Sequence, residues 1–110
     1  MATYIVSGNY TSEAIKGLIA APSDRSVAVK SIVESAGGSL VSYLVTTGES
    51  DFSMVVSTDD VEGMLAVLMV AGASGGVCNL KTVQAFSGAE FEAAQKRAGG
   101  LAAGYKSLVK

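Results

Sequence analysis

The sequence predicts an α+β domain in which a single antiparallel sheet carries helices on one face. Stretches rich in β-branched and aromatic residues alternate with stretches of helical periodicity. Their order is strand, helix, strand, strand, helix, strand, with one more helix and a tail at the end. This order is the split βαβ, or ferredoxin-like, plan, in which the helices leave the other sheet face open.

The expected elements follow from local residue patterns. A hairpin is the clearest of them, because Gly48-Glu49-Ser50-Asp51 separates two runs suited to a pleated surface. The strands are expected near residues 3–10, 39–47, 51–57 and 77–86, in the sheet order 4-1-3-2. The helices are expected near residues 12–20, 24–36, 60–72 and 88–98.

Helix ends are marked by capping residues and by the single proline. Pro22 separates the first two helical stretches because it lacks an amide donor and clashes with the preceding turn. Ser23 or Asp24 then caps the second helix, and Asp59 is expected to cap the third. Ser87 and Glu90 have the spacing of a capping box that opens the last helix. Within the third helix, the periodic apolar residues predict a face packed into the core: Val61, Met64, Leu65, Leu68, Met69 and Gly72.

Composition excludes several classes of function. Hydrophobic residues make up 49% of the 110 residues and charged residues only 16%, so we expect a second subunit to cover part of the apolar surface. The most apolar run, Met64–Ala73, is shorter than the roughly 20 residues that span a bilayer. No secretory signal is recognised at the N-terminus, and one cysteine makes no internal disulfide, so a cytoplasmic location is expected. A net charge of −2 argues against nucleic-acid binding.

Cofactor chemistry is also restricted. The chain contains no histidine, which argues against histidine-ligated haem, most zinc sites and Ser-His-Asp catalysis. It contains no GxGxxG fingerprint and no P-loop ending, so no nucleotide cofactor is expected. We therefore expect no cofactor and no metal.

A family resemblance adds to these expectations. The segment YIVSGNYTSEAIKGL, the break at Pro22, the glycine turn before Asp51 and the strand ending AFS before a capped helix resemble the GYD domain family of small bacterial proteins, over about residues 2–95. Gly48 and Asp51 match the Gly-x-Tyr-Asp turn of that family, whereas Ser50 stands where the family has tyrosine. The resemblance implies a ferredoxin-like domain that associates sheet to sheet, as a dimeric α/β barrel, and implies no activity. The domain is expected over residues 1–98, followed by a flexible basic tail over 99–110.

Strand alternation sorts the candidate site residues by face. Phe52, Met54 and Val56 should meet the helices, and their neighbours should line the open face. The residues expected to form a binding site on that face are Ser7, Asn9, Tyr43, Asp51 and Ser53. Such a site suits a small polar-aromatic molecule, and the alternative is a polar rim round a subunit interface. Asp51 is expected to accept a hydrogen bond from the amides of its own turn.

Three functions remain open. The favoured one is a structural or regulatory homo-oligomer that binds a small molecule or a protein partner, although the residues do not decide whether the chain is an enzyme. The second is a small dimeric-barrel enzyme, a cofactor-free monooxygenase or isomerase, with Asp51 as general base if burial raises its pKa. The third is a self-assembly module, because a small apolar domain with an exposed sheet edge can build larger arrays.

Overall fold

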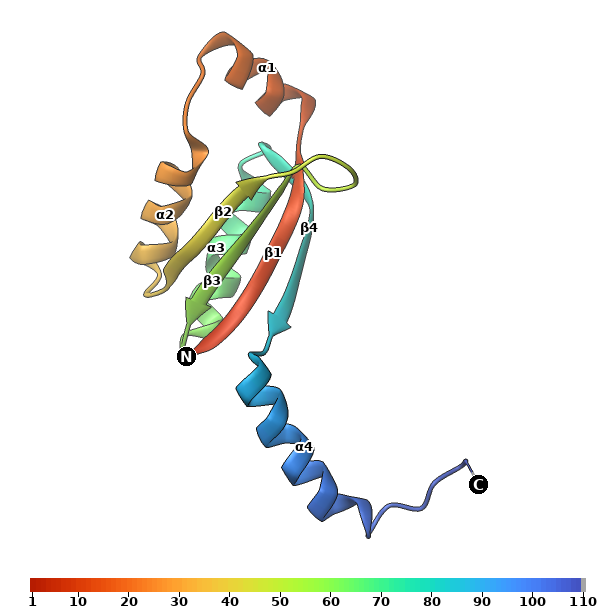
Figure 1. Cartoon of the computed structure of the whole chain (residues 1–110). Coiled ribbons are helices and arrows are strands. Elements are labelled where there is room, and N and C mark those ends of the chain that lie inside the picture. The colour runs from red at the N-terminus through yellow and green to blue at the C-terminus, as the bar shows by residue number, and fades with distance from the viewer. Residues whose placement is uncertain (110) are drawn as a thin grey trace.

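Four strands form one antiparallel sheet in the order β2-β3-β1-β4, which confirms the predicted order (Figure 1). The structure is a computed structural model that describes residues 1–109. The strands are β1 (Ala2–Tyr10), β2 (Ser39–Val45), β3 (Phe52–Thr58) and β4 (Val77–Ala85). The helices are α1 (Ser12–Ala20), α2 (Arg25–Ser35), α3 (Val61–Ala73) and α4 (Gly88–Ala102).

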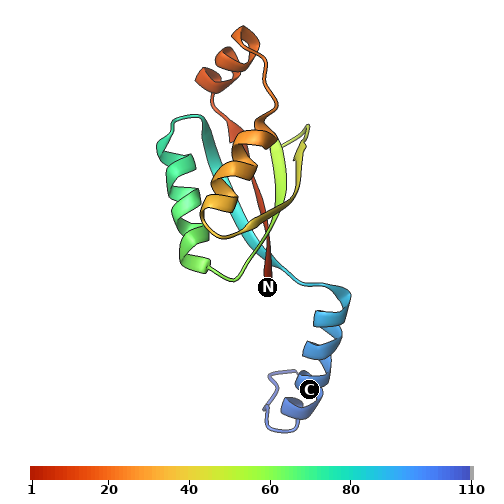
Figure 2. The same ribbon diagram turned by 90° about the vertical axis from the view of Figure 1, so that its left-hand side faces the viewer.

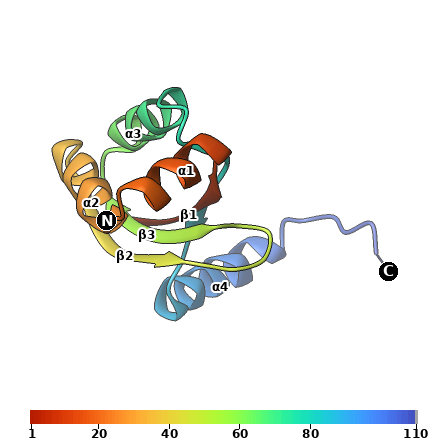
Figure 3. The ribbon, with the colours of Figure 1, turned by 90° about the horizontal axis from the view of Figure 1, so that it is seen from above.

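The helices are not distributed evenly around the sheet. Figure 2 shows α2 and α3 side by side over one face, with α1 beyond the end of the sheet. Seen from above, α1, α2 and α3 all lie on one side of the strands and α4 lies on the other (Figure 3). Because α4 projects away from the body, the molecule measures 61 × 31 × 22 Å. Its radius of gyration is 18.0 Å, against ~13 Å for a compact chain of this length.

The core lies between β1 and β3 on one side and α2 and α3 on the other. Phe52, Met54 and Val56 are buried while the side chains between them are only half-buried, which confirms the predicted facing of β3. Val6 of β1 and Val33 of α2 complete the centre of this cluster. The core is small, so many large apolar side chains elsewhere remain exposed.

Two bulges adjust the direction of side chains in the sheet. The β1–β3 register runs without interruption through Gly8, so Gly8 does not change which way its neighbours point. The irregularity lies in the pairing of β1 with β4, beside Asn79, which adopts a left-handed conformation at φ 53°. A second irregularity, between Leu40 and Ser42, shifts the register of β2 against β3.

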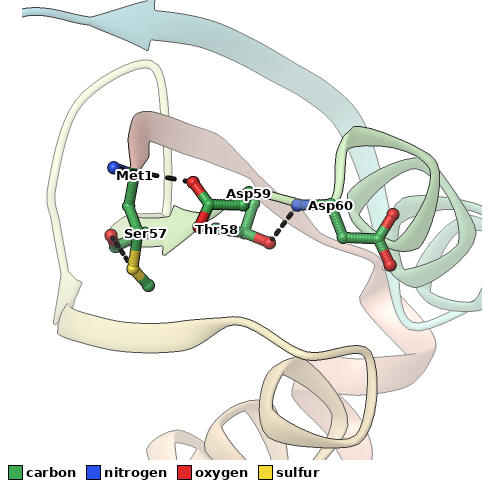
Figure 4. A network of polar contacts seen from close by, with 5 residues as sticks. All are labelled: Met1, Ser57, Thr58, Asp59 and Asp60. Carbon is green, nitrogen blue, oxygen red and sulfur yellow. Dashed lines mark hydrogen bonds and ion pairs between the residues drawn. The ribbon is translucent and has the colours of Figure 1, made fainter.

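The helix caps follow the sequence with one exception. Thr11 caps α1, Asp24 caps α2, and the capping box at the start of α4 is formed as predicted. The prediction that Asp59 caps α3 is wrong, because Asp60 accepts from the amide of Gly63 at 2.9 Å. Figure 4 shows the reason: Thr58 extends the strand and its hydroxyl accepts from the amide of Asp60, at 3.0 Å, which moves the helix start by one residue.

Asp59 instead points to the other end of the chain. Its carboxylate lies 3.5 Å from the N-terminal amine of Met1, in an exposed ion pair (Figure 4). An exposed pair of this kind contributes little to stability, since both charges are solvated. The residue that the sequence marks as a helix cap is therefore a surface residue.

The apolar face expected on α3 is only partly correct. Met64 is buried and Leu68 packs against the core, but Val61, Leu65 and Met69 are exposed. The helix is apolar on nearly all sides, so the apolar pattern alone does not select the buried one.

Two elements, β2 and α4, end at residues other than those that the sequence predicts. β2 ends at Val45, before the expected residue 47, because the amide and hydroxyl of Thr46 bind the carbonyls of Asp51 and Ser50 across the loop. α4 continues to Ala102, across the expected boundary near residue 98. Lys110 of the expected tail lies outside the described residues. Among residues 1–109, no helix combines the length and the apolar character that crossing a membrane requires.

Candidate functional site

A cleft of about 620 Å³ lies under α1 at the end of the sheet, on the helix side. It forms because α1 is displaced from the sheet, so the ends of β1 and β2 are left without a helix above them (Figure 2). Two carboxylates, Asp24 and Asp51, and one guanidinium, Arg25, line it. Its other polar residues are Tyr10, Ser23, Ser26, Tyr43 and Thr46. Apolar groups come from α1, the Pro22 turn and the end of β2: Ile15, Leu18, Pro22 and Val45.

Two tyrosine side chains form the floor of this cleft. The hydroxyls of Tyr10 and Tyr43 are hydrogen bonded to each other, and both rings lie against Phe52, with centroids 5.3 Å and 6.0 Å away. Partial burial, together with the hydrogen bond between the Tyr43 and Tyr10 hydroxyls, raises the pKa of the Tyr43 phenol above its ordinary value. Tyr43 is therefore a neutral phenol at physiological pH, able to donate or accept a hydrogen bond but not to act as a base.

Gly8 allows this aromatic group to form. A Cβ atom at that position would lie 2.9 Å from Cζ of Phe52 and 2.9 Å from Cδ2 of Leu80. The ring of Phe52 thus lies close to the backbone of β1, and both tyrosine rings pack against it.

Asp51 connects the hairpin loop to the end of β1. Its carboxylate Oδ2 accepts a hydrogen bond from the amide of Tyr10 at 2.9 Å, and its own amide donates to the carbonyl of Gly8 at 2.8 Å. The expectation that Asp51 binds amides of its own turn is wrong, since its side-chain partner is on a different strand. The carboxylate lines the cleft, but one of its oxygens already fixes the position of Tyr10.

Arg25 is the cationic residue of the cleft. It is the first residue of α2 and is exposed, and it forms no ion pair with any of residues 1–109. Its neighbour Asp24 is held by Ser26 instead, whose hydroxyl and amide lower the pKa of that carboxyl below its usual value. The guanidinium is therefore free to pair with an anionic group that enters the cleft.

Comparison with models of known families shows which family the chain belongs to. The family model described as GYD domain matches residues 4–94. The chain belongs to the GYD domain family. This confirms the resemblance found in the sequence.

The likeness to a solved structure supports the fold of this GYD domain. TTHA0845 from Thermus thermophilus is 20% identical, with a TM-score of 0.52 over 79% of this chain and 95% of that one. Its likeness supports a ferredoxin-like arrangement of the sheet and helices. FFRP-DM1 is 16% identical, with a TM-score of 0.49 over 78% of this chain and 100% of the other. No curated protein matches the sequence.

The structure divides the five predicted site residues between two places. Ser7 and Ser53 are direct cross-strand neighbours on the open face, as expected. Tyr43 lies on the opposite face, because it pairs with the buried Met54 and packs against the core. Placing Tyr43 on the open face is therefore wrong. The bulge between Leu40 and Ser42 is the reason, since the extra residue turns Tyr43 toward the helices.

Asn9 has a structural partner on each side. Its amide nitrogen donates to the carbonyl of Glu49 at 2.8 Å, and its oxygen accepts from the side chain of Asn79 at 3.3 Å. It thereby links the hairpin loop to the bulge of β4. Asp51 lies on the same loop but is turned toward the cleft of this GYD domain, so the two residues do not share a site.

Sequence reasoning missed Tyr10 and Arg25. Tyr10 follows Gly8 by two residues, so alternation along β1 puts it on the helix side together with Val6. Arg25 directly follows the capping residue Asp24, which places it at the N-terminus of α2. Both positions are readable from local patterns, but the cleft exists only because α1 is displaced from the sheet, and no local pattern encodes that displacement.

Proposed function

We propose that this GYD domain binds a small anionic molecule with an aromatic or apolar body in the cleft under α1. The proposal rests on the guanidinium of Arg25, which forms no ion pair within residues 1–109 and lines the same cleft as Tyr10 and Tyr43. A carboxylate suits the planar donor fork of arginine, and a phenol can complete its hydrogen bonding. The apolar side chains of Ile15, Leu18 and Val45 suit the body of such a molecule.

Benzoate is a suitable probe, with neutral benzamide as its comparison. We expect benzoate to shift the amide NMR signals of Tyr43 and Thr46 more strongly than benzamide does. Arg25→Gln should weaken benzoate binding about tenfold, since it removes one charge-assisted hydrogen-bonding group. Lys30→Gln is the matched control, because Lys30 is on the same helix but is paired with Glu34 at 3.9 Å. Equal binding of benzoate to the wild type and to Arg25→Gln would contradict the proposal.

The enzymatic alternative is supported less well by the cleft. A general base must be free to accept a proton from substrate, whereas one oxygen of Asp51 accepts from Tyr10. Tyr43 stays protonated because its pKa is raised, so it does not act as a base. Turnover of an activated aromatic substrate that disappears in Asp51→Asn would nevertheless establish the enzyme and replace the binding role.

The protein is further proposed to act as a homodimer that joins sheet to sheet, in the manner of a dimeric α/β barrel. The composition of the open face supports this part. Its residues are Thr3, Ile5, Ser7, Ser42, Leu44, Ser53, Val55, Ser57, Lys81, Val83 and Ala85, with one charge among them. A sheet face with so little charge is better covered than exposed to water. A stable monomer of 11.1 kDa in sedimentation equilibrium would contradict this.

A further inference from the structure

A groove of about 550 Å³ adjoins the cleft under α1. It is lined by residues of α1, α2 and α3 and by the start of β4, on the helix side of the sheet (Figure 3). Its volume falls in the range of about 300–1,000 Å³ that small-molecule sites take. The groove and the cleft share four lining residues: Tyr10, Leu18, Ser23 and Arg25. A molecule held by Arg25 can therefore reach the groove as well as the cleft.

The groove stays open because the side of α1 that lines it carries mostly small side chains. Four residues recur there at spacings of three and four positions: Ala14, Gly17, Leu18 and Ala21. No residue of α1 is buried, and a Cβ atom at Gly17 would have nothing within 4 Å. The walls from α2 and α3 are also apolar, with Ala28, Val29, Ile32, Val70 and Ala71. The helix α1 therefore lines the groove without filling it.

The groove and the cleft differ in charge. The carboxylates of Asp24 and Asp51 line the cleft, and neither of them lines the groove. Among the described residues that line the groove, Arg25 alone is charged. A long apolar chain in the cleft would remove water from two carboxylates, which is costly, whereas in the groove it would cover apolar side chains. The groove is therefore the better place for a long apolar chain, and Arg25 is the partner for an anionic group at the end of that chain.

The length of the groove follows from how α1 is attached. At the start of the helix, the amide of Thr11 donates to the carbonyl of Gly76 at 3.0 Å, and its hydroxyl donates to the carbonyl of Gly75 at 2.8 Å. Arg25 lies beyond the other end of α1, after the Pro22 turn. Between Ala14 and Ala21 the helix rises by about 10 Å. An extended chain of about eight carbons, with bonds of about 1.5 Å, spans about 9 Å.

We propose that the ligand of this GYD domain is a carboxylate with an unbranched aliphatic chain of about eight carbons, the chemistry of a medium-chain fatty acid. The carboxylate pairs with Arg25, and the chain lies in the groove along α1. The inference rests on the proposed function, because it needs the same guanidinium as the partner of the anion. It adds the chemical class of the ligand and the place of its chain.

Chain length is the variable that tests the inference, with isothermal titration calorimetry of the full chain against butanoate, octanoate and dodecanoate. Each methylene that leaves water completely raises affinity by about fourfold. Val70 in the wall is 57% exposed, so the groove is partly open to solvent. We therefore expect a smaller gain, about tenfold in total from butanoate to octanoate. From octanoate to dodecanoate the affinity should level off, because the longer chain extends past the groove.

Two substitutions fill the groove from different walls. Gly17→Leu adds a side chain from α1 and Ala28→Leu adds one from α2. Each should reduce the gain from butanoate to octanoate to less than about threefold, because the added side chain takes the place of the ligand chain. Gly72→Leu is the matched control and should keep the gain, since Gly72 lies outside the groove, in α3, with nothing within 4 Å of a Cβ. Circular dichroism confirms that each variant is folded.

Benzoate separates this inference from the proposed function. If benzoate binds but affinity does not rise from butanoate to octanoate, the inference is overturned and the proposed function stands. A full gain in both Gly17→Leu and Ala28→Leu, or its loss in Gly72→Leu, would place the chain elsewhere and overturn the inference too. The same holds if octanoate binds equally to the wild type and to Arg25→Gln, since the chain would then bind without its anchor. If neither benzoate nor octanoate binds, both fail.

Discussion

The carboxylate of Asp51 accepts a hydrogen bond from the backbone amide of Tyr10, at 2.9 Å. This contact joins the loop between β2 and β3 to the last residue of β1, where no ladder partner from β3 remains. The same carboxylate therefore fixes the position of a tyrosine in the cleft and the position of the loop. Replacing it affects structure first and ligand binding second.

Asp51→Asn should lower the free energy of unfolding by about 1 kcal/mol or less, because the amide oxygen keeps one acceptor for the amide of Tyr10. Asp51→Ala should cost more, about 1–3 kcal/mol, since that amide then loses its partner. Urea denaturation of both variants measures the difference. Glu49→Gln is the control, because Glu49 is exposed and contributes its carbonyl, not its carboxylate, to the bond with Asn9.

An unchanged unfolding free energy in Asp51→Asn combined with complete loss of benzoate binding would contradict the structural role. The carboxylate would then act directly on the ligand.

Tyr43→Phe should change how stability depends on alkaline pH. The pKa of Tyr43 is raised in the folded state, mainly by burial, from an ordinary value of 10.0. Above that value the unfolded chain releases the phenol proton while the folded chain keeps it, so the free energy of unfolding falls as pH rises. Below pH 10 this contribution is fully present. Denaturant midpoints between pH 8 and pH 11 should fall more steeply for the wild type than for Tyr43→Phe.

The matched control is Tyr4→Phe, for which we expect the steep wild-type decline to persist. A decline in Tyr43→Phe as steep as in the wild type would show that Tyr43 does not hold its proton more tightly in the folded state.

The sequence predicted what depends on local patterns. The hairpin, the facing of Phe52, Met54 and Val56 and the capping box at Ser87 follow from turn chemistry, alternation and capping, and all are present in the structure. The strand order, which is also confirmed, follows from the split βαβ plan and not from a local pattern. The candidate site was predicted only in part. Tyr43 was assigned to the wrong face because one extra residue in β2 changes the alternation, and nothing in the composition of that strand marks it.

The sequence and the structure indicate different residues as the N-cap of α3: the sequence indicates Asp59 and the structure shows Asp60. Asp60→Ala should destabilise the fold by about 1 kcal/mol, because the amide of Gly63 loses the side chain that accepts from it. Asp59→Ala should change stability by less than about 0.5 kcal/mol, since it removes only an exposed ion pair with the N-terminus. Thermal or urea unfolding of the two variants shows which substitution lowers stability more. A larger loss for Asp59→Ala than for Asp60→Ala would show that Asp59 is the cap.

Gly8→Ala should be among the most damaging small substitutions in the chain. Its Cβ would lie 2.9 Å from both Phe52 Cζ and Leu80 Cδ2, and 3.1 Å from the carbonyl oxygen of Cys78, so two side chains and a backbone atom must move. Overpacking of this kind costs typically about 1–3 kcal/mol. Because the ring of Phe52 supports Tyr10 and Tyr43, its displacement should also weaken benzoate binding. Gly17→Ala in α1 is the control, since nothing lies within 4 Å of a Cβ there and alanine favours the helix. A Gly8→Ala protein as stable as Gly17→Ala would show that β1 does not need the close approach of Phe52.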